Sequence, residues 1–227
     1  MDGATRTRLE RLLGCGVLAA QSLGGGHGVL HYRLTLSGGR SAFAKIQDQD
    51  PSGNEADSFA AEAHGLSWLG EARAAPVPAV LASDPAFLVT DWIDTGRPTP
   101  AAATTFGHEL ARLHATRAAS FGAPWHGVIA GLPLPNEQAD SWPDWYAGNR
   151  LLPYARIARD AGTLGSADIR LIEAAAARSG DLAGPPEPPS RIHGDCWSSH
   201  CTNKHHSRVA SFHDDTRAWP GPVVSHR

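Results

Sequence analysis

The sequence predicts an α+β protein in two parts, a small antiparallel sheet with one helix followed by a mostly helical second part. Short apolar runs bounded by glycine fill the first part, which is typical of strands. From residue 104 onward, apolar residues recur at helical spacing. A stretch with glycine and proline, residues 94–98, separates the two patterns. We therefore expect an N-terminal part of residues 1–93 and a C-terminal part of residues 94–227.

Three strands are predicted near the start of the chain. An apolar run over residues 17–23 leads into the glycine cluster 24–28, and apolar residues then alternate over 29–36. The turn residues 37–39 (Ser-Gly-Gly) precede a third apolar run over 42–46. This order predicts an antiparallel three-stranded meander.

A helix and two more strands complete the predicted first part. Apolar residues at helical spacing predict an amphipathic helix over residues 54–70, with Phe59, Ala63, Leu66 and Leu69 on its covered face. Two prolines end the helix, and short strands are expected at 79–82 and 87–93. The result is a sheet of about five strands with one helix against it.

Helices dominate the predicted second part. The first covers residues 104–115, and further helices are expected over 141–161 and 166–179. The segment 184–189 is too rich in proline for regular structure and leads into the short stretch 191–195. We therefore expect this stretch to lie in a loop after the helices.

Composition and charge exclude several classes of protein. The 227 residues carry a formal net charge of -3, so no basic surface favours nucleic acid or an anionic membrane. No apolar run approaches the roughly 20 residues of a membrane helix, and residues 1–13 lack the apolar core of a secretory signal. Three cysteines outside any CxxC pattern fit a reducing compartment. We expect a cytoplasmic protein that binds neither nucleic acid nor membranes.

Three features of the first part could together hold a phosphate group. A glycine cluster between strands lets the backbone approach a phosphate closely, although glycine hairpins without ligands are common. Lys45 lies in an apolar strand, where it must reach water or meet an anion. Glu62 lies on the following helix and could pair with it or face solvent. The order of glycine hairpin, strand lysine and helix glutamate is typical of proteins that bind ATP phosphates.

His193-Gly194-Asp195 has the form of a catalytic loop. In such loops the aspartate accepts the proton of an attacking hydroxyl group. A tripeptide is weak support alone, but it follows the helices of the second part, where a base facing the phosphates is expected. An asparagine normally follows five residues later and holds a magnesium ion, and this chain has His200 there.

The sequence resembles the fructosamine (ketosamine) kinases, relatives of the aminoglycoside phosphotransferases. The resemblance covers residues 24–198, and its stretches are Gly24-Gly25-Gly26-His27-Gly28, Phe43-Ala44-Lys45, residues 59–66, 88–93, 110–114 and His193-Gly194-Asp195-Cys196-Trp197-Ser198. It implies a two-lobed protein-kinase-like fold. It also implies transfer of a phosphoryl group from ATP, with Mg²⁺, to a sugar hydroxyl of a small or protein-bound glycated amine.

The resemblance assigns roles to single residues. Lys45 would grip the ATP phosphates beside the glycines Gly24, Gly25, Gly26 and Gly28. Glu62 would orient Lys45, and the backbone of Asp91, Trp92 and Ile93 would receive the adenine. Asp195 would be the catalytic base, and Trp197 would line the sugar pocket.

The family pattern is not followed after Ser198, so we expect the second lobe to be incomplete at its C-terminal end. His200 and Asp214 are the candidate metal ligands there. A catalytically impaired pseudokinase that still binds nucleotide or a partner is the alternative, favoured by the histidine at position 200. A further alternative is a zinc cluster of cysteine and histidine side chains, namely Cys196, His200, Cys201, His205, His206 and His213.

Overall fold

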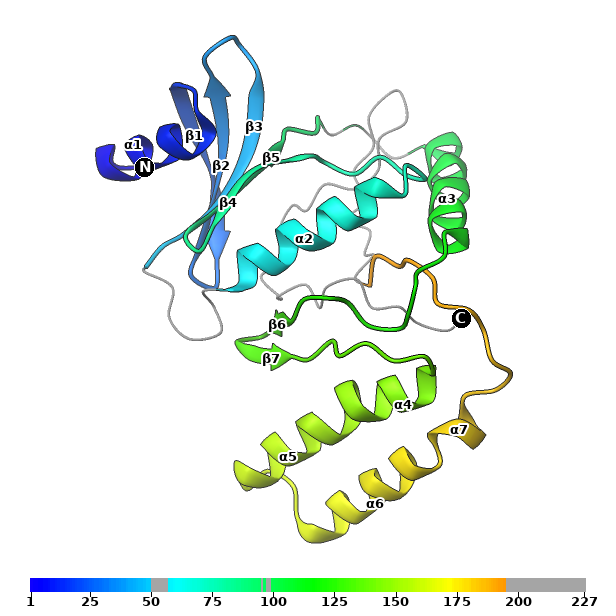
Figure 1. Ribbon diagram of the computed structural model, residues 1–227. Helices are drawn as coiled ribbons and strands as arrows, with labels where there is room; N and C mark the ends of the chain where they lie inside the picture. Colours follow the sequence, from blue (N-terminus) through cyan, green and yellow to red (C-terminus); the bar gives the residue numbers. More distant parts are fainter. Residues whose placement is uncertain (50–56, 95, 97–98, 195–227) are drawn as a thin grey trace.

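The computed structural model of the chain describes residues 1–49, 57–94, 96 and 99–194 (Figure 1). Its main sheet has five antiparallel strands in the order β1-β2-β3-β5-β4. The strands are β1 (Val17–Gly26), β2 (Val29–Leu36), β3 (Ser41–Gln47), β4 (Val80–Asp84) and β5 (Phe87–Asp91). The expected meander and the two later strands are therefore present. The first strand continues through the glycines instead of stopping before them.

Helix α1 (Gly3–Leu13) covers one face of this sheet, here called the outer face. Asp2 caps the helix by accepting a hydrogen bond from the backbone N–H of Thr5 at 2.8 Å. Leu9 of α1 is fully buried and packs into the core on the outer face of the sheet, which includes Leu34 of β2 and Val89 of β5. The sequence reading did not predict this helix, because most of its residues are polar and Leu9 alone is fully buried.

Helix α2 (Ser58–Glu71) covers the opposite face, here called the inner face. Its Phe59 and Ala63 pack against Leu88 of β5. Alternate residues of a strand point to opposite faces, so Ala42, Ala44 and Ile46 of β3 join the outer core while Lys45 points to the inner face. The predicted helix over 54–70 is confirmed in its body. Its first expected turn, residues 54–56, lies outside the described residues.

The second part begins with α3 (Pro100–Ala115), four residues before the predicted start. Thr99 caps it by accepting a hydrogen bond from the Ala102 backbone N–H at 3.2 Å, and proline at the first helical position suits a helix start. A hairpin of β6 (Gly127–Ile129) and β7 (Leu132–Leu134) follows. We did not predict this hairpin, because strands of three residues show too little alternation to detect.

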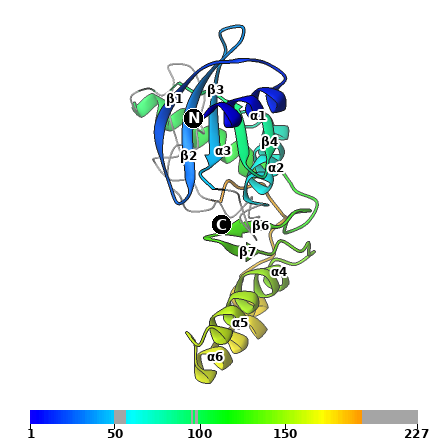
Figure 2. The ribbon, with the colours of Figure 1, turned by 90° about the vertical axis from the view of Figure 1, so that its left-hand side faces the viewer.

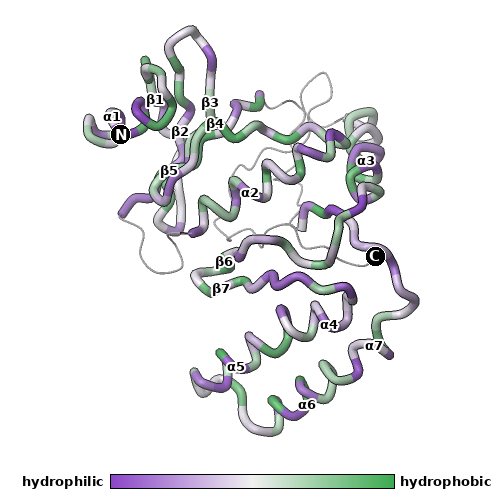
Figure 3. Tube along the Cα trace, in the orientation of Figure 1, coloured by the Kyte–Doolittle hydropathy of each residue, from purple (hydrophilic) through white to green (hydrophobic). Residues whose placement is uncertain are grey.

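The predicted helix over 141–161 is a continuous helical run with a wide turn inside it. It comprises α4 (Trp142–Tyr146), the π-helical turn η2 (Ala147–Leu151) and α5 (Leu152–Asp160). The chain then forms α6 (Ser166–Ala177) and the short α7 (Ser179–Leu182). These helices extend away from the sheet (Figure 2), and hydrophobic and hydrophilic residues alternate along α5 and α6 (Figure 3). Among the described residues, no helix is long and apolar enough to cross a membrane.

The wide turn η2 places two polar side chains against the segment that follows β7. Asn149 is 5% exposed and accepts a hydrogen bond from the backbone N–H of Glu137 at 2.8 Å. Arg150 donates to Oδ1 of Asn136 at 2.6 Å and stacks over the ring of Trp145 at 4.5 Å. Burial lowers the pKa of the Arg150 guanidinium to about 10, so it remains charged at neutral pH. These contacts join the η2 turn to the segment that follows β7 within the second part of the chain.

Gly122 provides a test of this packing. Its φ is +89°, and an added Cβ would lie 2.7 Å from each of three atoms, namely the carbonyl oxygens of Asn136 and Glu137 and Nε1 of Trp145. We expect Gly122→Ala to lower the free energy of unfolding by about 3 kcal/mol, since strain and overpacking add. Urea denaturation of Gly131→Ala is the control. That glycine also has a positive φ, +76°, but nothing lies near its added Cβ, so about 1 kcal/mol is expected. Equal losses in both variants would contradict the packing argument.

Candidate functional site

Lys45 and Glu62 form an ion pair between the inner face of the sheet and α2. The Lys45 Nζ lies 2.9 Å from Oε1 and 3.0 Å from Oε2 of Glu62. Their side chains are 18% and 10% exposed, so solvent screens the pair only in part. The structure thus brings together two residues, 17 positions apart in sequence, that the sequence analysis assigned to one site.

The glycine cluster lies in the same region of the sheet. Strand register places Gly24 opposite His31, and His31 opposite Lys45 on the next strand. Because neighbouring strands are about 4.8 Å apart, the glycine backbone lies on the order of 10 Å from the Lys45 backbone. The predicted phosphate-binding glycines and the predicted phosphate-binding lysine are therefore neighbours across β2.

The turn between β1 and β2 is tight, and its close backbone approach requires glycine. His27 and Gly28 have φ values of +48° and +79°, as a two-residue hairpin turn demands. A Cβ on Gly25 would lie 2.3 Å from the Val29 carbonyl oxygen. Glycine at position 25 therefore allows the two strands to approach each other more closely than a side chain would permit.

The end of β5 forms the edge of the site. The backbone N–H of Asp91 donates to the carbonyl oxygen of Ala79 at 2.9 Å, and its carboxylate pairs with Arg40. Ile93 is 6% exposed and belongs to the core. The predicted adenine-binding segment therefore leaves β5 at a fixed position.

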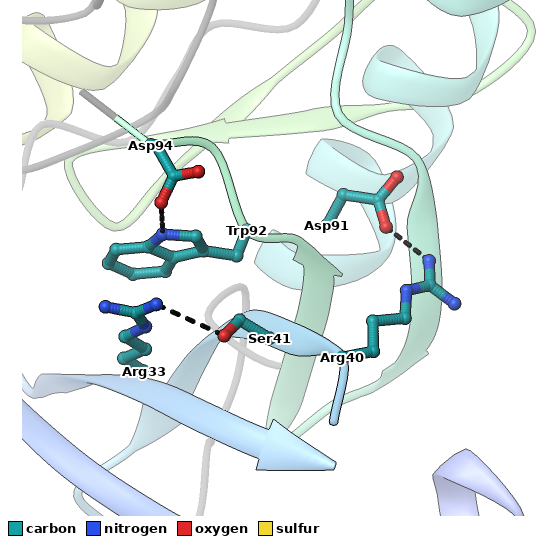
Figure 4. A pocket seen from close by; sticks show the side chains of 6 residues that line it. All are labelled: Arg33, Arg40, Ser41, Asp91, Trp92 and Asp94. Carbon is teal, nitrogen blue, oxygen red and sulfur yellow. Dashed lines mark hydrogen bonds and ion pairs between the residues drawn. The ribbon is translucent and has the colours of Figure 1, made fainter. Parts of the chain in front are cut away.

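A hollow of about 360 Å³ lies beside this segment (Figure 4). The guanidinium of Arg33 stacks over the Trp92 ring at 4.5 Å, and the indole N–H of Trp92 donates to Asp94 at 2.9 Å. Sequence reasoning missed four lining residues: Arg33, Arg40, Ser41 and Asp94. Arg33 alone had a signal, since it alternates with buried Tyr32 and Leu34 and so must point to the inner face.

The remaining candidate residues are not placed by the structure. Asp195, Trp197, His200 and Asp214 lie outside the described residues, as do the six members of the alternative zinc cluster. Within the described ranges, no group of three or more histidine, cysteine or acidic side chains could hold a metal ion. The described chain ends with His193, which is 8% exposed, and Gly194.

Comparison with known proteins identifies the family. The fructosamine kinase family model matches residues 3–219, beyond both ends of the stretch on which the sequence resemblance rested. A protein of Thermobifida fusca, named as a fructosamine-3-kinase, has a solved structure that is 39% identical with a TM-score of 0.81, covering 96% of this chain and 75% of that one. A Haemophilus somnus structure named in the same way is 21% identical with a TM-score of 0.72, covering 91% and 70%, and supports the fold alone.

A curated relative gives the same result over a shorter region. A Synechocystis protein named as a probable ketoamine kinase is 31% identical over 147 residues, which are 62% of this chain and 48% of that protein. The match thus spans about half the length of the curated relative. The two-lobed kinase-like fold expected from the sequence is confirmed by the structural likeness. The chain belongs to the fructosamine kinase family.

Proposed function

We propose that this protein transfers the γ-phosphoryl group of ATP to a sugar hydroxyl of a ketosamine, a sugar attached to an amine. The observation that carries the proposal is the Lys45–Glu62 pair beside the glycine hairpin, in a chain of this family. The substrate class follows the names of the relatives, which include a fructosamine-3-kinase and a ketoamine kinase. Small and protein-bound glycated amines both carry the required hydroxyl group.

The described residues fit the polyphosphate of ATP. The Lys45 side chain is only partly exposed, Glu62 holds it on the inner face, and the glycine hairpin lies two strands away in register. ATP supplies the phosphoryl group, and Mg²⁺ neutralises its developing charge when bound. Lys45 would bind the phosphates, while the backbone of residues 91–93 would receive the base. Most of the rate gain in such a transfer comes from positioning and charge neutralisation.

Asp195 is our candidate for the group that accepts the proton of the attacking hydroxyl. Trp197 would line the sugar pocket, and His200 and Asp214 would contribute to holding the metal ion. The histidine at position 200 favours one alternative, a pseudokinase that binds nucleotide without turnover, because an amide oxygen is the expected metal ligand there.

We also propose the boundaries of the two lobes and the cellular location of the protein. We propose that residues 1–93 form the nucleotide lobe and residues 94–227 the substrate lobe, since the hairpin, Lys45 and Glu62 all lie before residue 94. We also propose a cytoplasmic protein, supported by free Cys15 and by the absence of a membrane-crossing helix among the described residues.

The test is ATP consumption by the purified protein with Mg²⁺ and a panel of ribulosamines and fructosamines. Free fructose, free lysine, an aminoglycoside and choline serve as comparison acceptors. Turnover restricted to the sugar-amines would establish the substrate class. Turnover with the aminoglycoside or choline alone would overturn it, and nucleotide binding without any turnover would favour the pseudokinase.

Gly25→Ala should weaken nucleotide binding. The added Cβ would meet the Val29 carbonyl oxygen at 2.3 Å, so the two strands of the hairpin must move apart and the backbone N–H groups proposed to bind the phosphates are displaced. We expect the dissociation constant for a fluorescent ATP analogue to rise about tenfold, the cost of losing one or two backbone hydrogen bonds. Gly16→Ala is the control, because its Cβ meets only ordinary contacts, the nearest at 3.7 Å. A dissociation constant unchanged in Gly25→Ala would remove the hairpin from the site.

A further inference from the structure

Helix α2 makes contacts on two opposite faces. Glu62 points toward Lys45 on the sheet. With about 100° of rotation per residue, His64, Trp68 and Glu71 lie roughly 180° to 240° around the helix from Glu62. These three therefore face away from the Lys45–Glu62 pair. The residues that contact His64, Trp68 and Glu71 therefore hold α2 on the face opposite Glu62, here called the far face.

The contacts of this far face come from the second part of the chain. Trp68 packs against the core cluster of Phe121 and Trp145. Its ring lies 6.2 Å from that of Trp125 in an edge-on arrangement, and His64 lies 5.7 Å from the same ring. Helix α2 is thus held between the sheet and the second part, and Figure 1 shows it between β5 and the β6–β7 hairpin.

Arg191 contacts the same face with three different interactions. Its guanidinium lies over the Trp68 ring at 4.4 Å and donates a hydrogen bond to the Trp68 carbonyl oxygen. It also lies 3.5 Å from a carboxylate oxygen of Glu71. The Arg191 side chain is 16% exposed, whereas that of Glu71 is 66% exposed. The stacking and the backbone hydrogen bond therefore matter more than the ion pair.

The backbone at Arg191 is fixed as well. The N–H of Arg191 donates to the carbonyl oxygen of Thr116 at 3.1 Å, and that of Ala118 donates to Pro189 at 3.0 Å. Ser190 forms a bridge with Arg117 between these two hydrogen bonds. The chain four residues before Asp195 is thus attached both to the end of α3 and, through one side chain, to α2.

We propose that Arg191 is a positioning residue, which sets α2 and thereby the Lys45–Glu62 pair relative to the chain that leads into Asp195. The inference rests on the proposed function, because its kinetic consequence requires phosphate transfer. A helix is a rigid element, so loosening the far face of α2 is expected to displace Glu62 and the lysine that it holds. Misplacement of a charge at the reacting phosphate lowers kcat more than it raises KM.

The experiment compares Arg191→Leu with Arg191→Lys and with a control, Arg8→Leu. Arg8 makes two of the three kinds of contact on the outer face, 5.0 Å over the Phe87 ring and 2.8 Å from Asp84. We expect Arg191→Leu to lower kcat about 10- to 100-fold with the KM for ATP within about threefold. Arg191→Lys, which keeps the charge, should be intermediate. Arg8→Leu should lose stability but keep its kcat. Equal kcat in Arg191→Leu and Arg8→Leu would overturn the proposal.

Hydrogen exchange separates this inference from the proposed function. Amide exchange over residues 59–66 is measured by mass spectrometry without substrate, at a temperature where all variants are folded. Faster exchange in this part of α2 for Arg191→Leu, and not for Arg8→Leu, supports the coupling even if no acceptor is phosphorylated by the wild type. Unchanged exchange in Arg191→Leu overturns it, whatever the activity.

Discussion

Lys45→Met is expected to lower kcat/KM for phosphate transfer about 100- to 1000-fold, the usual cost of removing one preorganised charge from a transition state. Methionine keeps the apolar stem of the side chain on the inner face but leaves the 10%-exposed Glu62 carboxylate without the Lys45 ammonium, so folding of the variant is checked by circular dichroism before the kinetics. The loss should be carried mainly by kcat, because Lys45 meets the phosphates where negative charge develops. Steady-state kinetics with varied ATP, at a saturating ketosamine concentration, measures it.

The partner of Lys45 gives the matched experiment. Glu62→Gln keeps the shape of the side chain but removes the charge that lies 2.9 Å from Nζ. We expect a smaller loss than for Lys45→Met, and the double variant should be no worse than Lys45→Met because the two residues act as one unit. Arg159→Met, which removes an exposed cation from the pair with Asp160 at the end of α5, is the control. Additive losses at positions 45 and 62 would show that Glu62 has a separate role.

The strands could be predicted from the sequence because alternation records which face of a sheet is covered. Over β2, Tyr32, Leu34 and Leu36 are buried on the outer face, and this period of two is visible without a structure. The elements that the sequence did not predict, α1 and the β6–β7 hairpin, show no such periodic pattern. Helix α1 buries Leu9 fully and little else, and the hairpin of β6 and β7 is too short for a period to appear.

The site could be predicted in part because its first members follow a fixed order along the chain. Lys45 and Glu62 were paired from that order, and the structure places them in contact. The stack of Arg33 on Trp92 and that of Arg191 on Trp68 could not be found in this way. Each joins residues far apart in sequence, and an arginine near a tryptophan has no characteristic spacing when the fold brings the two together.

Asp195→Asn is expected to lower kcat by at least about 100-fold, since a positioned general base contributes 10²- to 10⁴-fold. Asparagine preserves the shape of the side chain but cannot take the proton of the attacking sugar hydroxyl. Nucleotide binding should stay within about twofold of the wild type, because Lys45, the hairpin and residues 91–93 all belong to the sheet side of the molecule. Measurements of turnover and of nucleotide affinity on the same preparation test both statements.

Asp181→Asn is the control for this variant, because it removes an exposed carboxylate from the short helix α7, where it lies 3.9 Å from Arg178. It should leave turnover unchanged. Turnover that persists in Asp195→Asn would show that another residue is the base, and it would not contradict the proposed ATP site. A wild type that binds nucleotide as tightly as Asp195→Asn and turns over no faster would mean that the catalytic loop is already impaired. The contrast between binding and turnover in these two proteins therefore separates a working kinase from a nucleotide-binding pseudokinase.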